Sequence, residues 1–315
     1  MLEVLKLIRI RTLVFTVFVM CTIRFCVIEP LLLKEGFFLQ MPAVAFALLI
    51  IAVCCLVAAA YVIDDYFDTR ADRISGVKAV IVGRHITRRT AIILHSLLNI
   101  VAIGLAFYVS LAVGQWKISL LFFLISGILW FYSSSYKRYL LVGNLIVAFL
   151  VGLIPLSVLV FEIPLLQEAH GQTAFFPDFM YLYKWVLGFS FFLLLNTFVY
   201  EINKDNYTMS GDMEKGNVTI PLKWGRKTAH YIMGTVIVIS MLAVIWLCIQ
   251  FFPFSIRIWT YILLVIELPY LFYLYTLLSF RGKRGMQLGI IRFIMVAGIA
   301  FAFFTGYILQ TMSVG

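Results

Sequence analysis

Nine apolar stretches of roughly 20 residues run through this chain, and they leave little room for any architecture other than a membrane protein. Each stretch is long enough to cross a hydrocarbon core of roughly 30 Å. The composition agrees, since 63% of the 315 residues are hydrophobic and only 13% are charged. We predict an all-α polytopic membrane protein of nine transmembrane helices, formed by a single domain over residues 1–315. The stretches lie at about 13–33, 42–63, 90–113, 118–136, 142–161, 182–203, 229–250, 256–279 and 287–311.

The positions of the basic residues predict how these helices are oriented. If the N-terminus lies in the cytoplasm, nineteen of the 25 Lys and Arg residues fall in cytoplasmic segments and four fall on the opposite side. An excess of Lys and Arg in cytoplasmic loops is typical of membrane proteins. The net charge of +10 is therefore a topology signal. We expect membrane lipids among the partners and no nucleic acid, and in a bacterium we expect the chain in the inner (plasma) membrane.

Four carboxylates appear abruptly where the second apolar stretch ends, in YVIDDYFDTRAD at residues 61–72. Asp64, Asp68 and Asp72 are four residues apart, so a continuing helix places them along one face, with Asp65 beside them. Like charges at this spacing repel one another. Oxygen-only ligands of this kind suit Mg²⁺. The pattern predicts a magnesium site, and the alternative interpretation is a solvated helix end.

A second charged segment, YEINKDNYTMSGDMEKGNVTIPLKWG at residues 200–225, follows the sixth stretch. Tyr200, Lys204 and Asp212 share a stripe with a period of four, and Asp205 lies next to the lysine. A lysine beside carboxylates suits a phosphate ligand, because its charge can neutralise phosphate oxygens. Taken alone, the segment fits either a charged loop or a binding site.

The two acidic segments resemble each other in composition and are separated by four apolar stretches. This arrangement predicts two pseudo-repeated halves around a central cavity, as in other internally repeated membrane folds. A third element, FYSSSYKRYLLVGN at residues 131–144, combines hydroxyl groups with the basic pair Lys137 and Arg138. It is interpreted either as a basic anchor at the membrane surface or as part of a diphosphate site.

These motifs resemble the UbiA superfamily of intramembrane prenyltransferases. The segment DDYFDTRAD at 64–72 is similar to the family signature N-D-x-x-D-x-x-x-D, and the spacing from Tyr200 to Asp212 is similar to Y-x-x-x-K-x-x-x-D-x-x-x-D. Asp64 stands where the family has asparagine, and Thr208 stands where it has aspartate. One carboxylate has thus moved from the second segment to the first, and we expect the first segment to hold more of the metal.

The resemblance implies a magnesium-dependent prenyltransferase that moves an isoprenoid chain from an allylic diphosphate donor to a hydrophobic or amphiphilic acceptor. It also implies roles for individual residues. Asp68, Tyr200 and Lys204 are the candidate catalytic residues. The candidate metal ligands are Asp64, Asp68, Asp72, Asp205 and Asp212. The candidate diphosphate ligands are Tyr132, Lys137, Arg138, Lys204 and Arg84, the last in a loop without the prolines typical of the family.

The acceptor is open to several interpretations. We expect a lipid of the geranylgeranylglycerol phosphate type, with an aromatic quinone precursor or a haem-type ring as alternatives. A cation-coupled transporter would place its acids near the bilayer midplane, whereas these acids lie at the ends of spans. A lipid phosphotransferase would carry a D-G-x-x-A-R pattern, which the sequence lacks. Neither of these two classes accounts for Tyr200 and Lys204.

Overall fold

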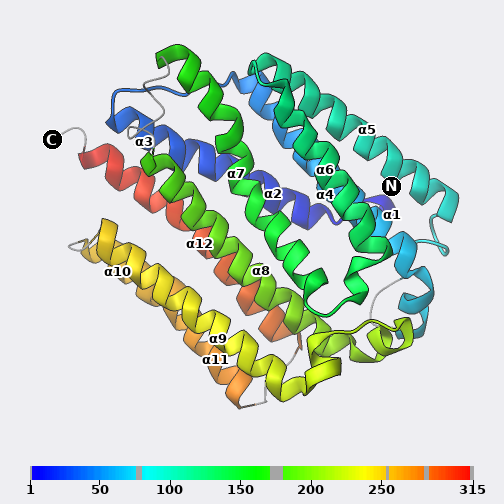
Figure 1. The fold of residues 1–315 in the computed structure, drawn as a ribbon. Helices are drawn as coiled ribbons and strands as arrows, with labels where there is room; N and C mark the ends of the chain where they lie inside the picture. The colour runs from blue at the N-terminus through cyan, green and yellow to red at the C-terminus, as the bar shows by residue number, and fades with distance from the viewer. Residues whose placement is uncertain (1, 76–79, 171–179, 253–254, 280–283, 313–315) are drawn as a thin grey trace. The chain divides into compact units, whose positions relative to one another are not determined.

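The structure, a computed structural model, describes residues 2–75, 80–170, 180–252, 255–279 and 284–312. Within these ranges the regular elements are all helical (Figure 1). They are α1 (Leu2–Leu7), α2 (Ile10–Thr22), η1 (Ile23–Ile28), α3 (Glu29–Lys34), α4 (Ala43–Ser75), α5 (Arg88–Ala112), η2 (Trp116–Ile118), α6 (Ser119–Ser134), η3 (Tyr136–Arg138), α7 (Val142–His170), α8 (Met180–Lys215), α9 (Ile220–Phe251), α10 (Ile256–Tyr261), η5 (Ile262–Glu267), α11 (Leu268–Leu278) and α12 (Arg284–Met312).

The described residues contain nine helical segments that are long and apolar enough to span a membrane. This confirms the predicted all-α class and the number of spans. The first span joins α2, η1 and α3, and the eighth joins α10, η5 and α11. In both spans a π-helical turn stands just before a proline, Pro30 or Pro269. Proline lacks an N–H and crowds the preceding turn, and the wider π turn accommodates it.

The chain forms two compact units. Unit 1 contains Met1–Lys137 and Ile154–Val186, and unit 2 contains Arg138–Leu153 and Leu187–Gly315. In unit 1, α4 and α5 lie side by side (Figure 1). In unit 2, α11 packs against both α9 and α12. The predicted internal repeat, central cavity and single domain stay predictions.

An apolar cluster in unit 1 fixes the end of α4 from which the acids project. Val62 of α4 is fully buried, as is Leu7 of α1, and both pack with Val82 and with Ala91 of α5. In unit 2 the corresponding anchors are aromatic. Tyr270 of α11 is fully buried, and its hydroxyl donates to Asn196 Oδ1 of α8 at 2.8 Å. Both acidic segments therefore extend from well-packed helices.

Candidate active site

The first acidic segment lies on the last turns of α4, which runs without interruption from the apolar stretch to Ser75. Asp64 and Asp68 are one helical turn apart and partly buried, and Asp65 is 8% exposed. The predicted helical stripe is therefore present over its first two members. The side chain of Asp72 lies outside the described residues.

Lys137 brings a positive charge into this stripe. Its Nζ lies 3.1 Å from Asp64 Oδ1 and 2.5 Å from Asp68 Oδ1, and its side chain is only 13% exposed. Burial disfavours the ammonium, but the nearby carboxylates of Asp64 and Asp68 outweigh this effect and raise the pKa of Lys137 above its usual value. The lysine is therefore a charged donor that bridges two carboxylates.

Arg9 is a second cation at this end of α4, and sequence reasoning missed it as a site residue. Its Nη2 lies 3.4 Å from Asp65 Oδ1 and 3.9 Å from Asp64 Oδ2, and its guanidinium carbon lies 4.1 Å from the centre of the Tyr61 ring. The backbone of Arg9 has a φ of 51°, a left-handed conformation that separates α1 from α2. The only sequence signal was its place among the cytoplasmic basic residues.

The remaining predicted diphosphate ligands outside α8 are Arg84, Tyr132 and Arg138. Arg84 is exposed in the turn between Ile81 and Ile86, and among the described side chains it makes no hydrogen bond or ion pair with these carboxylates. Tyr132 is half-buried on α6. Arg138 belongs to unit 2, where its side chain is exposed and its carbonyl accepts from the Val218 N–H at 3.0 Å. Their roles stay predictions.

The second acidic segment lies entirely on α8, which continues to Lys215. Tyr200 contacts Arg292 of α12 twice, because its hydroxyl accepts from the guanidinium and its ring centre lies 5.2 Å from the guanidinium carbon. One turn later, Lys204 forms an ion pair with Glu201 on the same helix. Asp205 is 8% exposed and accepts from Asn144 Nδ2 of α7 at 2.9 Å.

Asp212 is held by neutral donors at the end of α8. Its Oδ2 accepts from the Thr208 hydroxyl at 2.7 Å, and its Oδ1 accepts from Asn217 Nδ2 at 2.9 Å. Gly216, with φ of +70°, lets the chain turn so that Asn217 reaches back. The backbone N–H of Asn217 also donates to the Asp212 carbonyl at 2.9 Å. Thr208 thus serves as a hydrogen-bond donor to a carboxylate. Sequence reasoning missed Asn217.

The first segment fits a hard cation. Asp64 and Asp68 both bind the Lys137 ammonium through carboxylate oxygen atoms. Among the described residues no group of three or more His, Cys, Asp or Glu side chains is placed to hold a metal ion. Mg²⁺ keeps several waters and is usually bound by one or two carboxylates together with substrate phosphates. A carboxylate pair is therefore sufficient for this metal.

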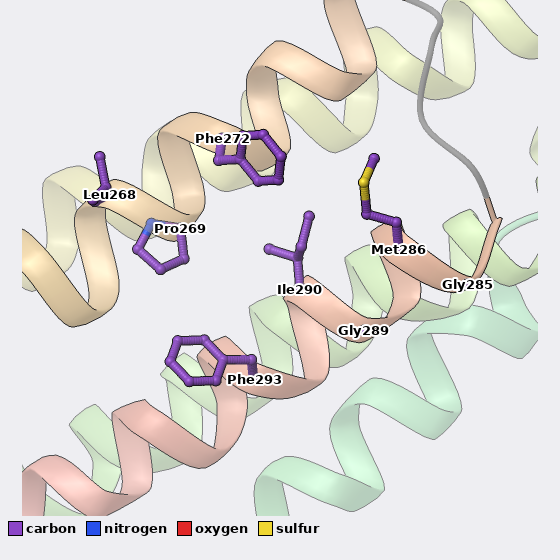
Figure 2. A pocket seen from close by; sticks show the side chains of 8 residues that line it. All are labelled: Leu268, Pro269, Phe272, Gly285, Met286, Gly289, Ile290 and Phe293. Atoms are coloured by element: carbon purple, nitrogen blue, oxygen red, sulfur yellow. The ribbon is translucent and has the colours of Figure 1, made fainter.

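A different kind of site lies in unit 2, between α11 and α12. Figure 2 shows a groove lined by apolar side chains and by glycine backbone. The volume of this groove is about 570 Å³. Its walls offer no charged side chain for a diphosphate, so it is unsuited to the reacting end of such a substrate. The lining residues are Leu268, Pro269, Phe272, Gly285, Met286, Gly289, Ile290 and Phe293.

Comparison with known proteins decides the family. The model of the UbiA prenyltransferase family matches residues 31–296, which is most of the chain. The chain belongs to the UbiA prenyltransferase family. Family membership confirms the predicted prenyltransferase class and the predicted integral, multi-pass membrane location.

Individual UbiA relatives make the comparison more specific. The digeranylgeranylglyceryl phosphate synthase of Methanobrevibacter smithii is 29% identical over 256 residues, which cover 81% of this chain and 83% of that protein. A solved structure of digeranylgeranylglyceryl phosphate synthase covers 96% of this chain and 98% of its own, with a TM-score of 0.56 and 22% identity. The second of these comparisons shows a shared fold.

A further solved structure bears on the metal and the donor. The UbiA homologue from Archaeoglobus fulgidus, bound to GPP and Mg²⁺, covers 96% of this chain and 99% of its own, with a TM-score of 0.57 and 16% identity. At this identity the likeness shows the fold alone, so the magnesium ion and the isoprenyl diphosphate donor stay predictions for this chain.

Proposed function

We propose that this UbiA-family protein transfers a geranylgeranyl chain from its diphosphate to geranylgeranylglyceryl phosphate, a lipid acceptor, and releases diphosphate. The observation that carries the proposal is the relative named digeranylgeranylglyceryl phosphate synthase, which matches 81% of this chain. In this reaction the allylic C–O bond of the donor breaks, and its electron pair leaves with the diphosphate. A new C–O bond forms to a glyceryl hydroxyl oxygen, which loses its proton.

The carboxylates would hold the magnesium ions. Asp64 and Asp68 are the first ligands, because they already share one cation, and Asp72 continues their sequence pattern. Asp205 and Asp212 are the ligands proposed from the second segment. Neutral donors orient both of these carboxylates. When bound, magnesium supplies positive charge to the diphosphate oxygens as the C–O bond breaks.

The cationic residues would neutralise the leaving diphosphate. Lys204 is 37% exposed on its side chain, so it can turn from Glu201 toward a phosphate oxygen. Tyr200 would donate its hydroxyl hydrogen to the same group while Arg292 holds the oxygen. Fixed donors of this kind favour the transition state, in which negative charge develops on the leaving group. The further proposed diphosphate ligands are Arg84, Tyr132, Lys137 and Arg138.

The proposal includes the orientation of the chain in the membrane and the extent of its functional domain. The excess of basic residues supports an N-terminus and two acidic segments on the cytoplasmic side. Membrane lipids would surround the nine spans, and residues 1–315 would act as one functional domain. The acceptor's polar end would then be presented at the cytoplasmic surface of the membrane.

The test is diphosphate release by the purified protein in lipid bilayers, with geranylgeranyl or farnesyl diphosphate and a panel of acceptors. The panel holds geranylgeranylglyceryl phosphate, an aromatic quinone precursor and a haem-type ring. We expect release that requires Mg²⁺, geranylgeranylglyceryl phosphate and an intact Asp68, with Asp68→Asn as the matched control. Turnover with an aromatic acceptor alone would replace the lipid assignment, and no turnover with any pair in folded protein would overturn the proposal.

A further inference from the structure

The Lys137 ammonium occupies the place where a cation shared by Asp64 and Asp68 would bind. Lys137 Nζ lies 3.1 Å from one carboxylate and 2.5 Å from the other, and the side chains of Lys137 and Asp68 are each 13% exposed. A metal ion that uses these two oxygens must therefore compete with the ammonium for the same lone pairs. Two cations at one carboxylate pair would also repel each other strongly, because the site is largely shielded from water.

We infer that the Lys137 ammonium occupies a metal site while no metal is bound. A divalent metal ion displaces it from Asp64 and Asp68 and thereby frees it to contact a phosphate. The inference rests on the proposed function for its phosphate ligand, but not for the exchange itself. Before the exchange, Lys137 neutralises two neighbouring carboxylates that would otherwise repel. After it, the ammonium is available only when the metal is already in place. Metal binding and phosphate binding would then occur in a fixed order.

The chemistry of the two cations in this region supports the exchange. Lysine carries its charge on a flexible four-carbon stem, and its three donors can turn toward a new acceptor. Lys137 also belongs to the short η3 turn, and its side chain reaches a helix more than 60 residues earlier in the chain. Arg9 is different, because its guanidinium also packs over the Tyr61 ring and approaches Asp65 more closely than Asp64. The lysine is therefore the cation that moves.

The direct test measures how fast Lys137 is chemically modified. Full-length purified protein is dimethylated briefly with and without Mg²⁺ at equal ionic strength, with no substrate, and modification is quantified by mass spectrometry. We expect Mg²⁺ to increase the modification of Lys137 by about fivefold or more, because a buried, ion-paired amine reacts slowly. Lys117, which is exposed, is the internal control and should not change. An unchanged or slower modification of Lys137 would overturn the inference.

A second measurement uses calorimetric titration with Mg²⁺ alone. Lys137→Met should bind the metal about tenfold more tightly than the wild type, since the competing charge is gone, and Lys137→Arg should remain close to the wild type. Weaker metal binding by Lys137→Met would mean that the lysine only orients the carboxylates. Neither measurement uses a prenyl substrate. Turnover with no lysine response would reject the exchange alone, and a lysine response with no turnover would reject the proposed function alone.

Discussion

The two acidic segments differ in what surrounds their carboxylates. In the first, Lys137 and Arg9 place positive charge against Asp64, Asp65 and Asp68. In the second, the described partners of Asp205 and Asp212 are amide and hydroxyl groups. A metal ion must displace a cationic partner, whereas neutral donors orient a carboxylate without placing a competing positive charge on it. The first segment is thus suited to exchanging a cationic side chain for a metal ion, and the second is suited to orienting its carboxylates.

The largest effect is expected at the first segment. Asp68→Asn removes the carboxylate that makes the shorter contact with Lys137, at 2.5 Å. Diphosphate release should fall about 100- to 1,000-fold, because a fixed group that stabilises charge in the transition state is lost. Turnover is measured at saturating donor, and the thermal unfolding midpoint serves as the control for folding. A loss of less than about fivefold would remove Asp68 from the metal site.

Lys204 gives the corresponding test in the second segment. Lys204→Met should lower turnover about 100-fold, because it removes a charge that neutralises the leaving diphosphate. Its ion-pair partner provides the matched control, since Glu201→Gln leaves the ammonium in place. That variant should retain most of the activity. Equal losses in the two variants would mean that the ion pair itself, and not the ammonium, matters.

Asp64 and Thr208 are the two positions at which this chain departs from the family signatures, and changing either should change the magnesium requirement. Asp64→Asn should raise the Mg²⁺ concentration for half-maximal activity about five- to tenfold, because the first segment loses a ligand. Thr208→Asp adds a carboxylate beside Asp212 and should lower that concentration by a few-fold. Activity is measured across a magnesium titration in both variants. An unchanged requirement in both would contradict the view that the first segment holds more of the metal.

The smallest effect is expected at Arg9. Its side chain is 30% exposed, and exposed ion pairs contribute about 1 kcal/mol or less. Arg9→Gln should lower the thermal unfolding midpoint by a few degrees and change turnover less than about threefold, while Arg9→Lys should retain most of the stability. A loss of turnover comparable to that of Asp68→Asn would show that Arg9 belongs to the reacting site. Arg9 and Lys137 would then have similar roles.

Much of the fold follows from the sequence because membrane spans need long apolar runs, and nine such runs are hard to misread. The spacing of Asp64 and Asp68 likewise predicts their shared face, since both lie on one helix. The π turn before Pro269 has no sequence pattern that would predict it. The spacing does not predict that Lys137 lies between the two carboxylates.

Two of the missed contacts share one physical cause. Lys137 is 69 residues from Asp68, and Arg9 is 56 residues from Asp65. Contacts of this range depend on how helices pack, and local patterns carry little information about packing. Asn217 was missed although it is near Asp212 in sequence, because its contact depends on the left-handed turn at Gly216. A conformation of that kind is indicated only weakly by a single glycine.

We propose that both acidic segments serve one magnesium-dependent prenyl transfer. The most direct measurement is a double-mutant cycle on diphosphate release with Asp68→Asn, Asp212→Asn and the combined variant. Residues that act as a unit in one reaction are strongly non-additive. We predict that the combined variant is little slower than Asp68→Asn alone. A combined loss equal to the product of the two single losses would contradict the claim.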